Sequence, residues 1–243
     1  MKQTKTLLVA AICLASVWSA SAVSTSFLRE RALNVDGTVT DDPYGAPLPA
    51  LGGVFDGVID VGTGLGTFTL MVTGAGSHYA AAFLDHDIDF GNNGSFNEFG
   101  GSLGAPAAGQ SWELGDPYNS TIYTDFSGSA LSNSSLLTGG GINGGDDVSM
   151  ALGWSFLLAA GDTATIGWTV SETAPAGGFY LVQTDPDSQE SIYFSSILRI
   201  DNGQGGGGGG GGGGNMPDGG STLVLLGAGL AALQAFRMQQ RRK

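Results

Sequence analysis

Three stretches in the middle of the chain alternate apolar and polar residues with a period of two. They cover residues 67–72, 163–170 and 191–200. Because successive side chains of a β-strand point to opposite faces, this period predicts strands that are buried on one face. Residues 148–159 alternate as well, and although their apolar side chains also fit one stripe of a helix, the six-step alternation and Gly153 favour a strand. The pattern therefore points to a fold built from strands.

Weaker strand candidates lie at 54–61, 78–85, 121–126 and 178–184, and glycine-containing turn signals separate the segments. About eight short strands joined in this way predict an all-β domain, a single β-sandwich of jelly-roll-like or immunoglobulin-like type. Two tryptophans, Trp154 and Trp168, fall on the apolar faces of their strands and are expected in the core. We place this domain at residues 54–204 and treat residues 23–53 as an N-terminal extension.

The charge balance excludes one class of partner. The chain has a formal net charge of −13, and residues 23–214 carry three arginines and no lysine against 21 acidic residues. Binding to nucleic acid without regard to sequence needs clustered positive charge, so we expect no nucleic-acid partner. The absence of lysine from this stretch also excludes Schiff-base chemistry there.

The N-terminus has the three parts of a secretory signal peptide. Lys2 and Lys5 form the basic region, an apolar stretch covers residues 7–17, and small residues at Ala20 and Ala22 fit the cleavage rule. We therefore predict a signal peptide at residues 1–22 and export through the secretion translocon. Cys13, the chain's only cysteine, lies inside this signal, so the mature protein can form neither disulfides nor thiolate metal sites.

The C-terminus carries an apolar run at residues 222–236, followed by the basic residues Arg237, Arg241, Arg242 and Lys243. A helix of that length rises about 22 Å, which is short of the roughly 30 Å hydrocarbon core of a bilayer. The run therefore suggests a provisional transmembrane anchor rather than a durable one. The basic residues should stay on the cytoplasmic side by the positive-inside rule, which leaves the rest of the chain outside.

A short motif precedes this run, formed by Met216, Pro217, Asp218, Gly219 and Gly220. Together with the glycine-bearing apolar run and the arginine-rich end, it resembles the VPDSG-type member of the PEP-CTERM sorting signals of secreted bacterial proteins. Two departures are Met216, where that family has valine, and Gly219, where it has serine. A plain turn followed by an ordinary tail anchor is the rival interpretation.

This resemblance implies a processing partner and a destination. In the family an exosortase, a membrane-embedded enzyme that resembles cysteine proteases and transpeptidases, recognises the motif and releases the helix. Residues 215–243 would then form the sorting signal, and the protein would end at the cell surface or in the extracellular matrix. Residues 146–154 and 178–188 also look like stretches of some PEP-CTERM proteins, which adds no activity.

Ten consecutive glycines at residues 205–214 separate the predicted domain from the sorting signal. Such a run behaves as a random coil with a reach on the order of 17 Å. We interpret it as a linker that presents the sorting motif to its enzyme. A phosphate-binding loop would need a lysine followed by serine or threonine directly after the glycines, and none is present there.

One acidic segment suggests a calcium site. Asp85, Asp87 and Asp89 are spaced as at the start of a calcium loop, with Asn93 and Glu98 following. The EF-hand pattern fails in detail, because its glycine and glutamate positions do not match. A different calcium loop built from these five residues is one interpretation, and a solvated polar loop is the other.

Catalysis is not expected. The two histidines are His78 and His86, and Ser77 precedes His78 directly, so their side chains should face opposite sides of a strand. We expect a non-enzymatic surface or matrix protein with a structural or interaction role, in contact with extracellular polysaccharide. The alternative is a calcium-dependent carbohydrate-binding module with Trp112 as the stacking residue. A carboxylate glycosidase is the third interpretation.

Overall fold

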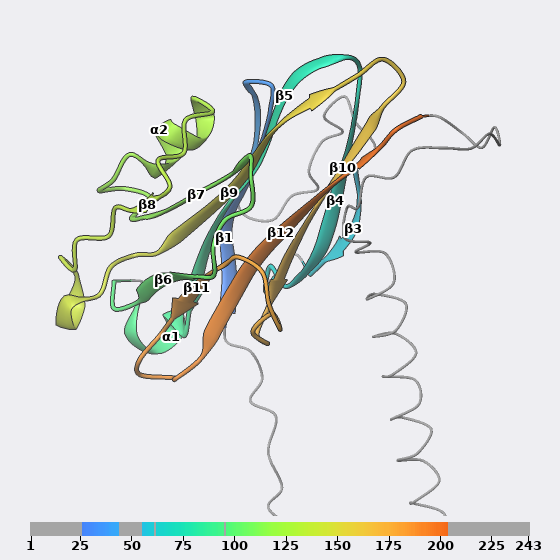
Figure 1. Ribbon diagram of the computed structural model, residues 1–243. Helices are drawn as coiled ribbons and strands as arrows, with labels where there is room; N and C mark the ends of the chain where they lie inside the picture. The colour runs from blue at the N-terminus through green and yellow to red at the C-terminus, as the bar shows by residue number, and fades with distance from the viewer. Residues whose placement is uncertain (1–25, 44–54, 61, 95, 204–243) are drawn as a thin grey trace, which may run out of the picture. The chain divides into compact units, whose positions relative to one another are not determined.

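The computed structural model describes residues 26–43, 55–60, 62–94 and 96–203, which form two six-stranded sheets (Figure 1). Sheet A contains, in spatial order, β2 (Thr38–Pro43), β1 (Ser26–Val35), β5 (Gly76–Ile88), β9 (Ser149–Leu158), β7 (Gln110–Gly115) and β8 (Ser134–Ser135). Sheet B contains β3 (Phe55–Ile59), β4 (Gly66–Thr73), β10 (Thr163–Ser171), β12 (Ser191–Asp201), β11 (Tyr180–Thr184) and β6 (Phe99–Leu103). The expected all-β class is confirmed for this part of the chain.

Helical structure in the described residues is limited to short segments. They are α1 (Phe90–Asn93), α2 (Ile122–Ser127) and a 3-10 turn at Ile142–Gly144. Adjacent strands pair in antiparallel fashion, except that β7 and β8 are parallel. Within these residues, no helix is long and apolar enough to span a bilayer.

The two sheets share one apolar core. Trp168 of β10 is fully buried and stacks on Phe68 of β4, with ring centroids 5.3 Å apart. Its indole N–H donates a hydrogen bond of 3.1 Å to the carbonyl of Leu152 in β9, so this side chain ties sheet B to sheet A. Trp154 of β9 is buried as well and donates to the Ser196 hydroxyl of β12. The expectation that both tryptophans lie in the core is therefore confirmed.

Strand β5 is buried on both faces, which explains its nearly continuous apolar sequence between residues 79 and 84. One face joins the shared core. The other face packs under α2, where Phe83 contacts Phe126 and meets the edge of the Tyr123 ring at 5.4 Å. Figure 1 shows α2 on the side of sheet A that faces away from sheet B. The outer face of sheet A is therefore a second, smaller apolar layer.

The predicted strand at residues 121–126 is wrong, because most of this segment forms α2. Ile122 and Phe126, four residues apart, are both buried against sheet A, which is the spacing of one helix face. The hydroxyl of Thr121 also donates to the carboxylate of Asp125 at 2.6 Å. The other predicted strands, including 148–159, coincide with β3, β4, β5, β9, β10, β11 and β12.

The boundary predicted at residue 54 also needs correction, because β1 and β2 belong to sheet A and β1 lies next to β5. The expected extension 23–53 thus contains two strands of the fold. A β-bulge at Arg29 interrupts β1, so the period-two alternation of apolar and polar residues does not run through this strand. The sequence Asp36-Gly37 is typical of a two-residue hairpin turn and indicates this hairpin. In the structure both residues have positive φ and connect β1 to β2.

Several predicted segments lie outside the described residues. These are the signal peptide at 1–22, the glycine linker at 205–214, and the sorting signal at 215–243 with its predicted transmembrane helix at 222–236.

Candidate functional site

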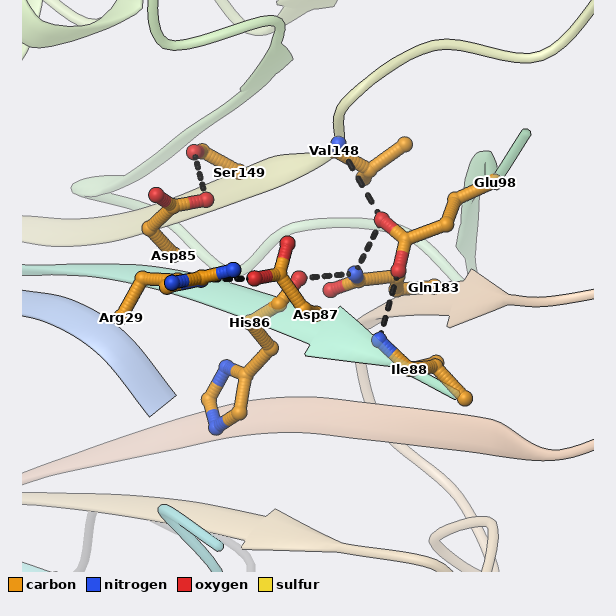
Figure 2. Close-up of polar contacts among 9 residues, drawn as sticks. All are labelled: Arg29, Asp85, His86, Asp87, Ile88, Glu98, Val148, Ser149 and Gln183. Atoms are coloured by element: carbon orange, nitrogen blue, oxygen red, sulfur yellow. Dashed lines mark hydrogen bonds and ion pairs between the residues drawn. The ribbon is translucent and has the colours of Figure 1, made fainter. Parts of the chain in front are cut away.

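The polar end of β5 carries the acidic residues that the sequence singles out. Asp85 and Asp87 project from one side of the strand and His86 from the other, as Figure 2 shows. The imidazole enters the space between the sheets, where it lies against the backbone of Gly64 and is fully buried. Burial lowers the pKa of His86 to about 4, so this ring is neutral near pH 7. The aspartates instead lie on the outer face of sheet A.

Each aspartate bonds to a side chain of a neighbouring strand. The Arg29 guanidinium, at the bulge of β1, forms an ion pair with Asp87. Ser149, the first residue of β9, donates its hydroxyl to Asp85 at 2.9 Å. Arg29 also lies over the ring of Phe90, with its central carbon 3.9 Å from the ring centroid. A bulge thus directs one basic side chain into an acidic surface.

Two further carboxylates belong to the same end of sheet A. Asp85 pairs with Ser149, so extending this register by two residues sets Asp147 across from Asp87. Asp116 follows β7, the strand on the other side of β9, and accepts bonds from the backbone of Tyr118 and the amide of Asn119. We call Asp85, Asp87, Asp116 and Asp147 the acidic cluster.

The acidic cluster is largely withdrawn from water. Its members are exposed to 3%, 1%, 6% and 3% in chain order. Burial, followed by the neighbouring charges, raises the pKa of Asp147 to about 8. Burial is also the main cause that raises the pKa of Asp85 to about 7, and the charge of Asp87 adds to it. One guanidinium does not compensate four such groups, because buried like charges disfavour one another's ionised form.

Glu98 has a different role from the one expected. Its carboxylate accepts hydrogen bonds from the backbone N–H of Ile88 at 2.7 Å and of Val148 at 3.3 Å. The Gln183 side chain donates to it at 2.6 Å and also to the carbonyl of His86 (Figure 2). Burial raises the pKa of Glu98 to about 9 against these donors. Since Gln183 lies in sheet B, Glu98 joins the two sheets.

The five predicted calcium ligands therefore do not converge. Asp85 and Asp87 lie together, Glu98 bonds to three donors elsewhere, and Asp89 precedes α1 with a left-handed backbone. Asn93 ends α1, and its side chain lies outside the described residues. Among the residues that the structure describes, no three His, Cys, Asp or Glu side chains stand as a ready-made metal site.

An open hollow of about 860 Å³ lies where Asp36, His78 and Leu157 meet. The two nitrogens of His78 bond to the Asp36 carboxylate at 2.8 Å and to the Gly74 carbonyl at 2.9 Å. Both acceptors require N–H donors, so they favour the protonated ring, and the bond to Asp36 raises the pKa of His78. A ring with both nitrogens so engaged is poorly suited to act as a general base.

Trp112, the expected stacking residue, is half-buried. Its ring packs against the shared core and lies 5.6 Å from the Phe179 ring. This position leaves less of the indole free for a ligand than the polar sequence around it suggested.

No family model, no curated protein and no solved structure matches the chain.

Sequence reasoning missed Arg29, Asp116 and Asp147 as members of one cluster. The sequence separates them from Asp85 by 56, 31 and 62 positions, and only the order of strands in sheet A brings them together. A usable signal was the position of Asp116 and Asp147 at strand ends, directly after β7 and before β9.

We predict that the acidic cluster makes stability fall as the pH rises. Asp147 has a folded pKa near 8 and an ordinary unfolded value near 4, so the folded state binds the extra proton between them. Replacing Asp147 with asparagine removes the contribution of this residue to the pH dependence. The gain in free energy of unfolding over the wild type should grow from pH 4 to pH 8, by up to about 1.4 kcal/mol per pH unit.

Urea unfolding of the full chain in chelator, followed by tryptophan fluorescence, measures this difference. The Asp201→Asn variant, at an exposed position of sheet B outside the acidic cluster, is the matched control. A difference between Asp147→Asn and wild type that stays constant across pH would contradict the prediction.

Proposed function

We propose that this protein is exported, held briefly at the membrane, and released by an exosortase-type enzyme as a structural or interaction component of the cell surface or extracellular matrix. The observation that carries the proposal is the order of parts along the chain. A signal-like start precedes the β unit, and a glycine tract, the motif at 216–220, an apolar run and a basic end follow it. The compact β unit ends at Gly203, directly before the glycine tract region.

The physical properties of the tail support temporary anchoring. A fifteen-residue helix of about 22 Å would hold a protein less securely than a span that matches the roughly 30 Å hydrocarbon core. Arginines beyond the helix would fix its orientation. A spacer of ten glycines would keep the folded unit from blocking access to the motif.

For the fold, we infer a β-sandwich with jelly-roll-like or immunoglobulin-like connections. Repeated crossing between the sheets supports it, for example from β4 to β5 and from β9 to β10. An experimental structure in which these connections stay within one sheet would contradict this inference.

The proposed processing predicts the mass of the protein recovered from a host that makes an exosortase. Intact mass spectrometry should show a polypeptide without residues 222–243. Replacing Pro217 and Asp218 together by alanine should preserve the full C-terminus, because the motif is lost while the helix is kept. Asp201→Ala, upstream of the glycine tract, is the control and should be processed normally. Full-length wild-type protein from such a host would contradict the proposal.

A second candidate function is binding of a neutral polysaccharide, and the outer face of sheet B favours it. No described helix covers this face, which presents rows of hydroxyl groups such as the Thr67–Thr169 pair at 2.9 Å. Tyr180 and Tyr193 lie side by side there, half-exposed, with ring centroids 5.8 Å apart. Tyrosine rings can stack on sugar faces while their hydroxyls form hydrogen bonds.

Affinity measurements on isolated cell-surface polysaccharide test this second candidate. Tyr193→Ala should weaken binding roughly 3- to 10-fold, which corresponds to about 0.5–1.5 kcal/mol for an aromatic contact. Tyr118→Ala is the matched control, because this exposed tyrosine follows β7 in sheet A and should leave binding unchanged. Equal affinity of Tyr193→Ala and wild type would remove this face as the binding surface.

A further inference from the structure

The acidic cluster is unusual because it combines four buried carboxylates with one described ion pair, between Arg29 and Asp87. Its carboxylates come from the ends of β5, β7 and β9, three adjacent strands of sheet A. Those of Asp85 and Asp87 lie on the outer face, which also carries the apolar layer under α2. Buried carboxylates are ordinarily paired, hydrogen-bonded or bound to a metal. Here the nearest basic group with a described ion pair is Arg29, and its partner is Asp87.

Asp147 is the member of the acidic cluster that has a buried oxygen without a hydrogen-bond partner. Only 3% of the surface of Asp147 is exposed, and its Oδ1 atom accepts no hydrogen bond. On the extended register this side chain shares the face of Ser149, beside Asp85 and opposite Asp87. The charges of Asp85 and Asp87 act on it directly. An oxygen so placed faces other carboxylates and has no donor.

We propose that this end of sheet A binds one divalent cation of the calcium class, with Asp85, Asp87 and Asp147 as its carboxylate ligands. The donor set consists of oxygens, since His86 points to the other side of β5 and the residues that the structure describes include no cysteine. Calcium accepts six to eight oxygen ligands in flexible geometry, which suits carboxylates from separate strands. The Ser149 hydroxyl, already bonded to Asp85, is the next nearest oxygen.

Arg29 and the cation compete for the same negative charge. The three carboxylates do not yet stand at ligand spacing, and the guanidinium is the counterion of Asp87. Cation binding would draw the carboxylates together and release Arg29 from Asp87. Arg29 is partly exposed and already lies over the faces of Phe27 and Phe90, so it keeps favourable contacts after release. This proposal does not depend on processing of the C-terminus.

Titration calorimetry and thermal unfolding of the chelator-treated full chain with calcium chloride test the proposal. We expect one binding site and a rise in Tm for the wild type and for the control Asp201→Asn. Asp147→Asn should bind calcium at least tenfold more weakly. No calcium binding to the wild type at millimolar concentration, or equal binding by folded Asp147→Asn, would overturn the proposal.

Arg29→Gln gives an independent result if Asp147→Asn does not fold. Because it removes the internal competitor, this variant should bind calcium more tightly than the wild type and show a larger rise in Tm. If Arg29 instead served only to hold the cluster together, the variant would lose stability and calcium would not restore it. That result would also overturn the proposal.

Discussion

Burial of several neighbouring carboxylates is the constraint on which the polar end of this fold depends. Asp85, Asp87, Asp116 and Asp147 lie within one small region of sheet A and are almost entirely withdrawn from water. The free-energy cost of burying these carboxylates can be tolerated only where packing elsewhere fixes the strands. Two apolar layers do so here, the core between the sheets and the smaller layer under α2. The bulge in β1 then supplies Arg29, which offsets part of that cost.

The opposite side of β5 shows how the same strand end is stabilised toward the core. Glu98 bridges Ile88 and Gln183, and thus the two sheets, through bonds that occupy both of its oxygens. His86 remains neutral between the sheets and packs against Gly64, where an added Cβ would clash with the imidazole Nε2 atom. The hydrogen bonds of Glu98 and the packing of His86 thus hold the end of β5 in place, although this segment is acidic.

The alternation of side chains was sufficient to predict most strands, because burial of one face imposes a period of two on the sequence. It failed at β1, where the bulge at Arg29 breaks the period, and at α2, whose Ile122 and Phe126 are too few to reveal a helical stripe. For the site, Asp85 and Asp87 were identified because they are close in sequence. Asp147 and Asp116 were not, because their proximity follows from strand order, and Glu98 was misassigned because its donors lie on other strands.

The behaviour of this end of the fold follows from the protonation of Asp85 and Asp147 near neutral pH. Carbon-13 NMR titration of the side-chain carboxyl carbons of the full chain, free of divalent cations, measures it directly. We expect titration midpoints near pH 7 for Asp85 and near pH 8 for Asp147. Midpoints near 4 for both, the ordinary value of an aspartate in water, would contradict it.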